Sequence, residues 1–404
     1  MGNNITKRPT FVQSLILLML FFVTLDLVNR HFYFVYIAFA LYLFILGRRM
    51  IINYSFAMLA LLSLAIACFS PSSHESIVGF IRSFSYPMCY VIGYGLCSQC
   101  NCNEDLSKVE KLIMKIIVVI VAGAFFHYTL NWIINFSADS RNTVDFWSGK
   151  VLVATNQAAM ACMALAVNIA CLFSKSNTKM KILSWVSLLV ILIYNLTLAG
   201  RTLIIMSLLV IAVAVIHRLK NDNKGRVKFA FLIICLIFLV LLAYNIDLFD
   251  IKTIVENSEL YDRFFGEYSQ GMTEDTRIDN KSNYIKHMFD YPFGGANLRS
   301  SFGYAHDIFL DTFDEAGWIS LFAIFFYIVS SVSRLNRIIK TKLFSFGLRQ
   351  VILCLYVVFY MEFMLEPVLQ ASPWLFEAFC IIDGSLCALL DIQKANVLSK
   401  RSKG

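Results

Sequence analysis

The chain has 404 residues, of which 58% are hydrophobic and only 15% are charged. Soluble domains average about 25% charged residues, and apolar runs of about 18 residues or more recur along this chain. This composition excludes an ordinary soluble domain. It predicts an all-α, polytopic membrane protein, because helices satisfy their own backbone hydrogen bonds in hydrocarbon. The net charge of +8 does not indicate nucleic-acid binding, since the basic residues gather in short segments between apolar runs.

Twelve apolar runs are predicted to cross the membrane, at residues 11–29, 32–47, 52–70, 77–97, 112–136, 151–173, 182–199, 202–217, 229–246, 307–333, 350–366 and 374–391. One long polar segment, residues 247–306, separates the ninth run from the tenth. The aromatic and aliphatic residues within it predict short amphipathic helices that lie on the membrane face. Residues 1–404 are accordingly predicted to form a single integral membrane domain.

The distribution of lysine and arginine predicts the orientation of these spans. If the N-terminus is cytoplasmic, most of the 35 basic residues fall in the inner connecting segments and in the two termini. Because basic residues are enriched in cytoplasmic loops, we expect both termini in the cytoplasm and the long polar segment on the outer side.

Two arginines lie where a charge is costly. Arg201 occupies a very short turn between two apolar runs, and Arg82 lies within the fourth run, near its outer end. A guanidinium can bind phosphate oxygens through two parallel hydrogen bonds, which suggests an anion clamp. Alternatively, each arginine extends along the apolar surface and places its charged head in the interface. The sequence leaves both interpretations open.

The end of the long polar segment carries residues suited to chemistry. Arg277 begins an amphipathic stretch, which a Tyr-Pro-Phe-Gly-Gly turn at residues 291–295 ends. Arg263 and Arg299 are interpreted as solvated loop charges. His306 lies at the first turn of the tenth span, where a neutral imidazole could accept a proton from a hydroxyl. A structural role for this histidine is the alternative.

Acidic residues near the spans allow further interpretations. Four of them share one helical face and would either hold a divalent metal or complement the positive helix N-terminus: Asp307, Asp311, Asp314 and Glu315. Glu362 and Glu366 lie one turn apart in the eleventh span, where carboxylates are expected to be functional and to pair with an arginine. The sequence contains no Walker motif, Rossmann glycine pattern, nucleophile elbow or HExxH, so no nucleotide or other cofactor is expected.

The order of these short motifs resembles the O-antigen polymerase and O-antigen ligase superfamily of polysaccharide-assembly membrane proteins. The matching features are the Ala-Thr-Asn-Gln start of a span that contains Asn156, the Gly-Arg turn at Arg201, the Arg277 helix leading into the turn at 291–294, and the Ala-His-Asp opening of the next span, followed by Leu310, Glu315 and Gly317. Asp307 stands where asparagine or serine is more usual in that family. The resemblance extends to the topology of the whole chain.

The resemblance implies a membrane-embedded, metal-independent glycosyltransferase of the GT-C kind, without a cofactor. Its donor would be a glycan on undecaprenyl diphosphate, at the outer face of the bacterial inner membrane. By motif, Arg201 and Arg277 correspond to arginines that hold the diphosphate, and His306 to the histidine that activates the acceptor hydroxyl. Further residues are expected to contact the substrate: Arg82, Asn156, Glu315, Glu362 and Glu366.

Polymerases and ligases share these motifs, but the stretch from Glu362 to Pro367, followed by Ser-Pro-Trp at 372–374, looks more like the polymerases. We therefore expect polymerisation of lipid-linked repeat units into O-antigen or a capsule-type polysaccharide. A ligase that transfers the glycan to a lipid A-core acceptor is one alternative. A transporter or flippase that binds the anionic cargo without chemistry is the other. The family also implies a partner that regulates chain length, and no nucleic-acid partner is expected.

Overall fold

The computed structural model describes residues 8–27, 31–45, 52–71, 77–98, 106–135, 143–152, 154–174, 177–198, 200–221, 251–257, 261 and 276–401. Within them the regular structure is helical apart from two short antiparallel strands, β1 (Thr143–Val144) and β2 (Val151–Leu152). The predicted all-α class is therefore confirmed. Five of the described helices are long and apolar enough to cross a membrane: Ala154–Phe173, Thr178–Asn195, Thr202–Asn221, Ile308–Lys340 and Phe346–Leu365. The predicted span at 229–246 lies outside the described residues.

The chain divides into two compact units. Unit 1 comprises Met1–His127, Thr276–Leu348 and Phe359–Gly404, and unit 2 comprises Tyr128–Asp275 and Arg349–Val358. The sequence has no flexible linker long enough to separate domains, and it predicted a single integral membrane domain. Each unit is assembled from pieces that are far apart in the chain, which hydropathy along the sequence does not reveal.

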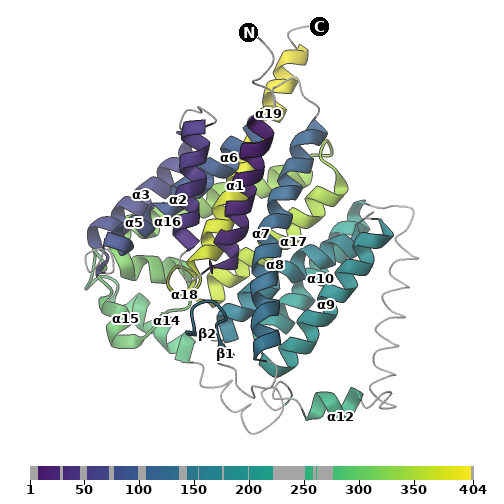
Figure 1. Cartoon of the computed structure of the whole chain (residues 1–404). Helices are drawn as coiled ribbons and strands as arrows, with labels where there is room; N and C mark the ends of the chain where they lie inside the picture. Colours follow the sequence, from purple (N-terminus) through teal and green to yellow (C-terminus); the bar gives the residue numbers. More distant parts are fainter. Residues whose placement is uncertain are drawn as a thin grey trace. The chain divides into compact units, whose positions relative to one another are not determined.

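Unit 1 holds the helices from both ends of the chain (Figure 1). The N-terminal helices are α1 (Arg8–Leu25), α2 (His31–Ala40) with its π-helical extension η2 (Leu41–Ile45), α3 (Tyr54–Phe69), α5 (Ile77–Ser83) and α6 (Ser85–Ser98). The later ones are α14 (Thr276–His287), α15 (Asn297–Phe302), α16 (Ile308–Lys340), α18 (Val368–Ala371) and α19 (Pro373–Arg401). Two further helices, α7 (Leu106–Ile134) and α17 (Phe346–Leu365), contribute residues to both units.

Unit 2 contains the two strands and the helices α8 (Ala154–Phe173), α9 (Thr178–Leu198), α10 (Arg201–Asn221) and α12 (Ile251–Glu256). Helix α8 packs against both α9 and α10. The Tyr194 hydroxyl on α9 donates to Gln157 Oε1 on α8 at 2.5 Å. Helices α9 and α10 leave large apolar side chains such as Leu192 and Leu208 exposed, as expected of helices whose outer faces contact lipid.

The predicted span at 77–97 is two helices rather than one. Helix α5 ends at Ser83 and α6 begins at Ser85, with Phe84 between them. Pro87 has no backbone N–H, so the carbonyl of Ser83 lacks its usual helical donor four residues later. The interruption places Arg82 in the last turn of a short helix instead of inside a long one.

Helices α6 and α19 lie side by side in unit 1 with their backbones in close contact (Figure 1). A Cβ added at Gly93 would lie 1.9 Å from the carbonyl oxygen of Ile381, and one at Gly384 would lie 2.2 Å from that of Tyr90. Ser385 Oγ also donates to the Gly93 carbonyl at 3.2 Å. Small residues of this kind allow helices to approach closely where hydrocarbon gives little hydrophobic driving force.

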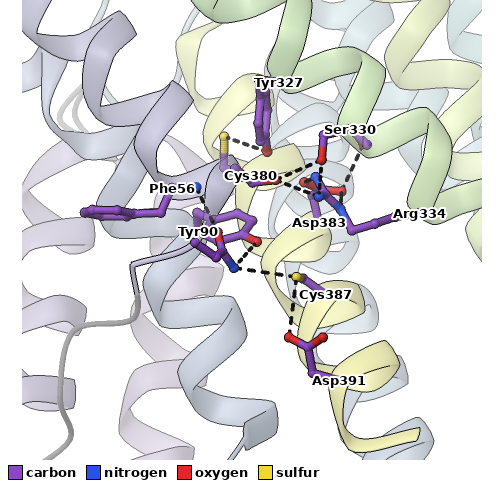
Figure 2. A network of polar contacts seen from close by, with 12 residues as sticks. Phe56, Tyr90, Tyr327, Ser330, Arg334, Cys380, Asp383, Cys387 and Asp391 are labelled. Carbon is purple, nitrogen blue, oxygen red and sulfur yellow. Dashed lines mark hydrogen bonds and ion pairs between the residues drawn. The ribbon is translucent and has the colours of Figure 1, made fainter. Parts of the chain in front are cut away.

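A buried ion pair joins α16 to α19 within unit 1 (Figure 2). Arg334 Nε donates to Asp383 Oδ1 at 3.0 Å, and Arg334 Nη2 bonds to the other carboxylate oxygen. Arg334 Nη1 donates to Ser55 Oγ at 2.6 Å and to Ser330 Oγ at 2.8 Å. Arg334 is therefore a buried link between α3, α16 and α19.

We predict that Asp383→Leu lowers the free energy of unfolding by about 3 to 5 kcal/mol, because Arg334 keeps a buried charge without its carboxylate. The double variant Arg334→Met with Asp383→Leu should recover most of this loss, since apolar residues often replace a buried pair at little cost. Thermal unfolding of the detergent-solubilised protein measures both effects. A single variant as stable as the wild type, or a double variant no better than the single, contradicts this account.

Candidate functional site

The residues before α16 form a hydrogen-bonded junction around His306. Asp307 is the N-cap of α16, and its Oδ1 accepts the backbone N–H of Phe309 at 3.0 Å. Asp311 accepts the backbone N–H groups of Ala305 and Asp307, both at 3.2 Å. These two amides flank His306, whose φ is +54°. Asp311 therefore holds the uncommon left-handed backbone conformation at His306.

A second junction joins the predicted turn at 291–295 to an interruption in α16. At Gly317 the backbone has φ of +70° and ψ of −155°, outside the helical range. Trp318 N donates to the Pro292 carbonyl at 3.1 Å, and a Cβ at Gly317 would lie 2.0 Å from the same oxygen. The span predicted as continuous over 307–333 is thus interrupted, because the turn supplies the acceptor that the helix would otherwise provide.

The interruption sets two carboxylates against neighbouring segments. Asp314 Oδ1 accepts the backbone N–H of Arg299 at 3.2 Å, near the start of α15. Glu315 accepts hydrogen bonds from Arg299 Nη1 at 2.5 Å, from Gln370 Nε2 at 3.3 Å and from Ser70 Oγ. Glu315 therefore ties α15, α18 and the end of α3 together.

Arg299 is not the solvated loop charge that the sequence suggested. Its side chain is 23% exposed and is paired with the nearly buried Glu315. Burial alone would lower the pKa of the Arg299 guanidinium, but the Glu315 carboxylate beside it raises that pKa. The interpretation was wrong because the two residues meet only through the interruption in α16, which hydropathy does not predict.

His306 shares a buried carboxylate with Arg277. Glu366 Oε2 lies 3.8 Å from His306 Nδ1, and Glu366 Oε1 lies 3.6 Å from Arg277 Nη2. Arg277 Nη1 also donates to the Leu365 carbonyl at 3.1 Å. The side chains of His306 and Arg277 are 24% and 32% exposed, whereas that of Glu366 is 7% exposed. The prediction that a carboxylate of the eleventh span pairs with an arginine is confirmed for Glu366.

Lys281 adds a second cation one turn along α14 from Arg277. Its Nζ donates to the Met364 carbonyl at 2.8 Å and lies 3.4 Å from Asp307 Oδ2. Two basic residues of α14 therefore contact the end of α17 and the segment just after it. Each is already paired with a carboxylate, so this cluster of charges is balanced.

A cavity of about 310 Å³ lies in unit 1 near this cluster. Tyr304 connects the two, because it lines the cavity and its ring centroid is 6.4 Å from that of His306. Arg82 also lines the cavity and donates from Nη2 to the Leu369 carbonyl at 3.4 Å. The polar side chains of the lining are those of Arg82, Ser83, Tyr86, Arg299, Tyr304, Glu315 and Gln370.

The four acidic residues predicted to share a helical face make separate contacts within the protein. Asp307 caps α16, Asp311 holds the backbone around His306, Asp314 bonds to α15, and Glu315 pairs with Arg299. Among the residues that the structure describes, no group of three or more His, Cys, Asp and Glu is placed to hold a metal. The alternative, a role at the helix N-terminus, is confirmed for Asp307.

The remaining predicted residues lie apart from this cluster or outside the described part. Glu362 is buried in α17, one turn before Glu366. Asn156 is half-buried near the start of α8, in unit 2. Arg201 is the first residue of α10, also in unit 2, and its side chain lies outside the described residues, as does all of Arg263. The predicted residues that the structure brings together all belong to unit 1.

The cluster combines the parts of a proton acceptor and an anion site. An imidazole whose Nδ1 faces a carboxylate can accept a proton at its other nitrogen. Guanidinium groups nearby match the geometry of phosphate and carboxylate oxygens. No protein-family model and no curated protein matches this chain. The chemical assignment therefore rests on the side chains of the cluster themselves.

Sequence reasoning missed Tyr304 and Gln370. Tyr304 comes two residues before His306, but a tyrosine near a membrane interface is ordinary and gives little signal. Gln370 lies on α18, which follows Pro367. Nothing in the sequence indicates that the turn after this proline brings an amide to Glu315.

Proposed function

We propose that the chain is a membrane glycosyltransferase that polymerises oligosaccharide repeat units carried on undecaprenyl diphosphate. The observation that supports this most strongly is the position of His306, directly before a helix of membrane-spanning length and beside the carboxylate that it shares with Arg277. A base next to a cation is what transfer of a glycosyl group from a diphosphate to a hydroxyl requires.

In this reaction the acceptor hydroxyl gives its proton to His306 Nε2 as its oxygen attacks the anomeric carbon of the donor. The bond between that carbon and the diphosphate oxygen breaks, and its electron pair leaves with the diphosphate. Negative charge on the leaving group therefore increases along the reaction. Fixed guanidinium groups stabilise such a transition state more than the ground state.

Glu366 has a positioning role in this proposal. It faces His306 Nδ1 with one oxygen and Arg277 Nη2 with the other. Arg82, Glu315 and Glu362, which belong to the same unit, are the other residues of unit 1 proposed to contact the substrate. Arg277 is already paired with Glu366, and Arg299 in the cavity lining is paired with Glu315. Arg82, the other arginine of that lining, is therefore the better candidate to bind an extra negative charge.

The proposal includes the topology that the basic residues predict. Twelve spans of the GT-C kind would place both termini in the cytoplasm and the segment 247–306 at the outer face of the bacterial inner membrane. The lipid-linked glycan would enter from that face. A membrane partner that regulates chain length would act there as well.

The purified chain, reconstituted in phospholipid vesicles, should convert an undecaprenyl-diphosphate-linked repeat unit into a ladder of longer glycans on the same carrier. Gel separation of the released glycans measures the ladder. Product that appears only after lipid A-core is added, in a single transfer, would instead identify a ligase. Movement of unmodified lipid-linked glycan across the vesicle membrane, without new glycosidic bonds, would identify a flippase.

A further inference from the structure

Among the described residues, one of the two arginines that line the cavity in unit 1 is not paired with a carboxylate. Arg82 and Arg299 both line it, but Arg299 is paired with Glu315. Within the described ranges, Arg82 makes one hydrogen bond, from Nη2 to the Leu369 carbonyl at 3.4 Å, and no ion pair. A guanidinium carries five N–H donors, so most of those of Arg82 remain available to a ligand. The charged residues of the lining, two arginines and one glutamate, leave one positive charge.

The rest of the lining suits a sugar ring. Tyr304 is 42% exposed, and the Arg299 guanidinium lies 5.6 Å from the centroid of its ring. This contact fixes a flat apolar surface at the edge of the cavity. Gln370, Ser83 and Glu315 add one amide, one hydroxyl and one carboxylate. Each hydroxyl group of a sugar can both donate and accept a hydrogen bond. The amide, hydroxyl and carboxylate of the lining provide partners for both.

The size of the cavity limits the ligand. Small-molecule pockets span roughly 300 to 1,000 Å³, and at about 310 Å³ this cavity is at the lower end. It has room for a single ring and not for a whole oligosaccharide unit. A free inorganic anion would fill only part of it and would not reach both Tyr304 and Gln370.

We propose that this cavity is a subsite for one anionic saccharide residue, whose negative group pairs with Arg82 and whose ring contacts Tyr304, Gln370 and Ser83. The inference rests on the proposed function, since it names the part of the lipid-linked substrate that the site near His306 would recognise. The negative group is either the carboxylate of an acidic sugar or the phosphate attached to the first sugar of the carrier. Both have the oxygens that a guanidinium binds.

Saturation-transfer NMR titrations of the detergent-solubilised full-length protein test this subsite with four probes: methyl glucuronide, glucose 1-phosphate, methyl glucoside and inorganic phosphate. At least one of the two charged saccharides should bind about tenfold more tightly than the neutral glucoside, as expected for a charge-assisted hydrogen bond. Their ranking shows whether the charge belongs to a sugar carboxylate or to a sugar phosphate. The proposal is overturned if the methyl glucoside binds as tightly as both charged saccharides. It is also overturned if inorganic phosphate alone binds as tightly as they do.

Two substitutions separate the contacts. Arg82→Gln should remove the tenfold preference and leave glucoside binding unchanged, whereas Tyr304→Ala should weaken the charged and the neutral saccharides alike. Arg337→Gln, on an exposed arginine of α16 outside the lining, is the matched control and should bind as the wild type does. An unchanged preference in Arg82→Gln overturns the subsite.

The two proposals fail in different ways. The titrations need no acceptor and no turnover. If the wild-type protein makes polymer but does not prefer the charged saccharides to the glucoside, only the subsite is overturned. A protein that shows the preference but forms no glycosidic bond overturns the proposed polymerase and leaves a saccharide-binding site.

Discussion

Replacing His306 with alanine is expected to lower polymer formation by about 10²- to 10⁴-fold, the range that a positioned general base contributes. The reason is the loss of the only group in the proposed mechanism that accepts the hydroxyl proton. Binding of the lipid-linked substrate should change little, because the carboxylate and guanidinium of Glu366 and Arg277 stay in place. The vesicle assay with gel separation of glycans measures the effect. A variant that makes chains of wild-type length at the wild-type rate rules out the base.

Two further variants keep this test independent of folding. The backbone at His306 has φ of +54°, and asparagine adopts such values more readily than alanine does. His306→Asn should therefore retain the junction and still lose activity. His287→Ala is the matched control, because His287 is exposed on α14 and pairs only with the exposed Asp290 among the described charged residues. It should leave polymer formation unchanged.

Most described helices could be located from the sequence, because an apolar run of membrane length can form few structures other than a helix. The predicted span at 182–199 corresponds to α9 (Thr178–Leu198), and that at 374–391 lies within α19 (Pro373–Arg401). Where the prediction of one continuous helix was wrong, a local feature interrupted it. Pro87 separates α5 from α6, and Gly317 interrupts α16 against a turn that the sequence did predict.

The candidate site was predictable only in part. A carboxylate deep in an apolar run must be paired, so Glu366 was expected to meet an arginine, and it meets Arg277. The same argument could not predict which arginine would pair with Glu366. Arg299 was interpreted as a solvated charge, yet it is paired with Glu315 across a turn. Arg334 is likewise paired with an acidic residue far along the chain, Asp383. Burial of this kind depends on tertiary contacts, and no pattern along the chain encodes it.

Gly317→Ala should be strongly destabilising, because it combines backbone strain with a collision. The backbone at Gly317, with φ of +70° and ψ of −155°, lies in a region that essentially only glycine occupies. A Cβ would also lie 2.0 Å from the Pro292 carbonyl oxygen, a backbone atom that accepts the Trp318 N–H and cannot move away freely. We expect a loss of at least about 3 kcal/mol of unfolding free energy, from strain and collision together.

Thermal unfolding monitored by size-exclusion chromatography in detergent measures this loss, and Gly347→Ala is the matched control. A Cβ at Gly347, in the first turn of α17, meets nothing within 4 Å, and alanine favours a helix over glycine by roughly 0.5 to 1 kcal/mol. The control should therefore be as stable as the wild type or slightly more so. If Gly317→Ala unfolds at the control's temperature, the contact between the turn and α16 is not rigid. The positions of Glu315, Arg299 and the cavity would then need another source of order, because they depend on the chain leaving and re-entering the helix at this glycine.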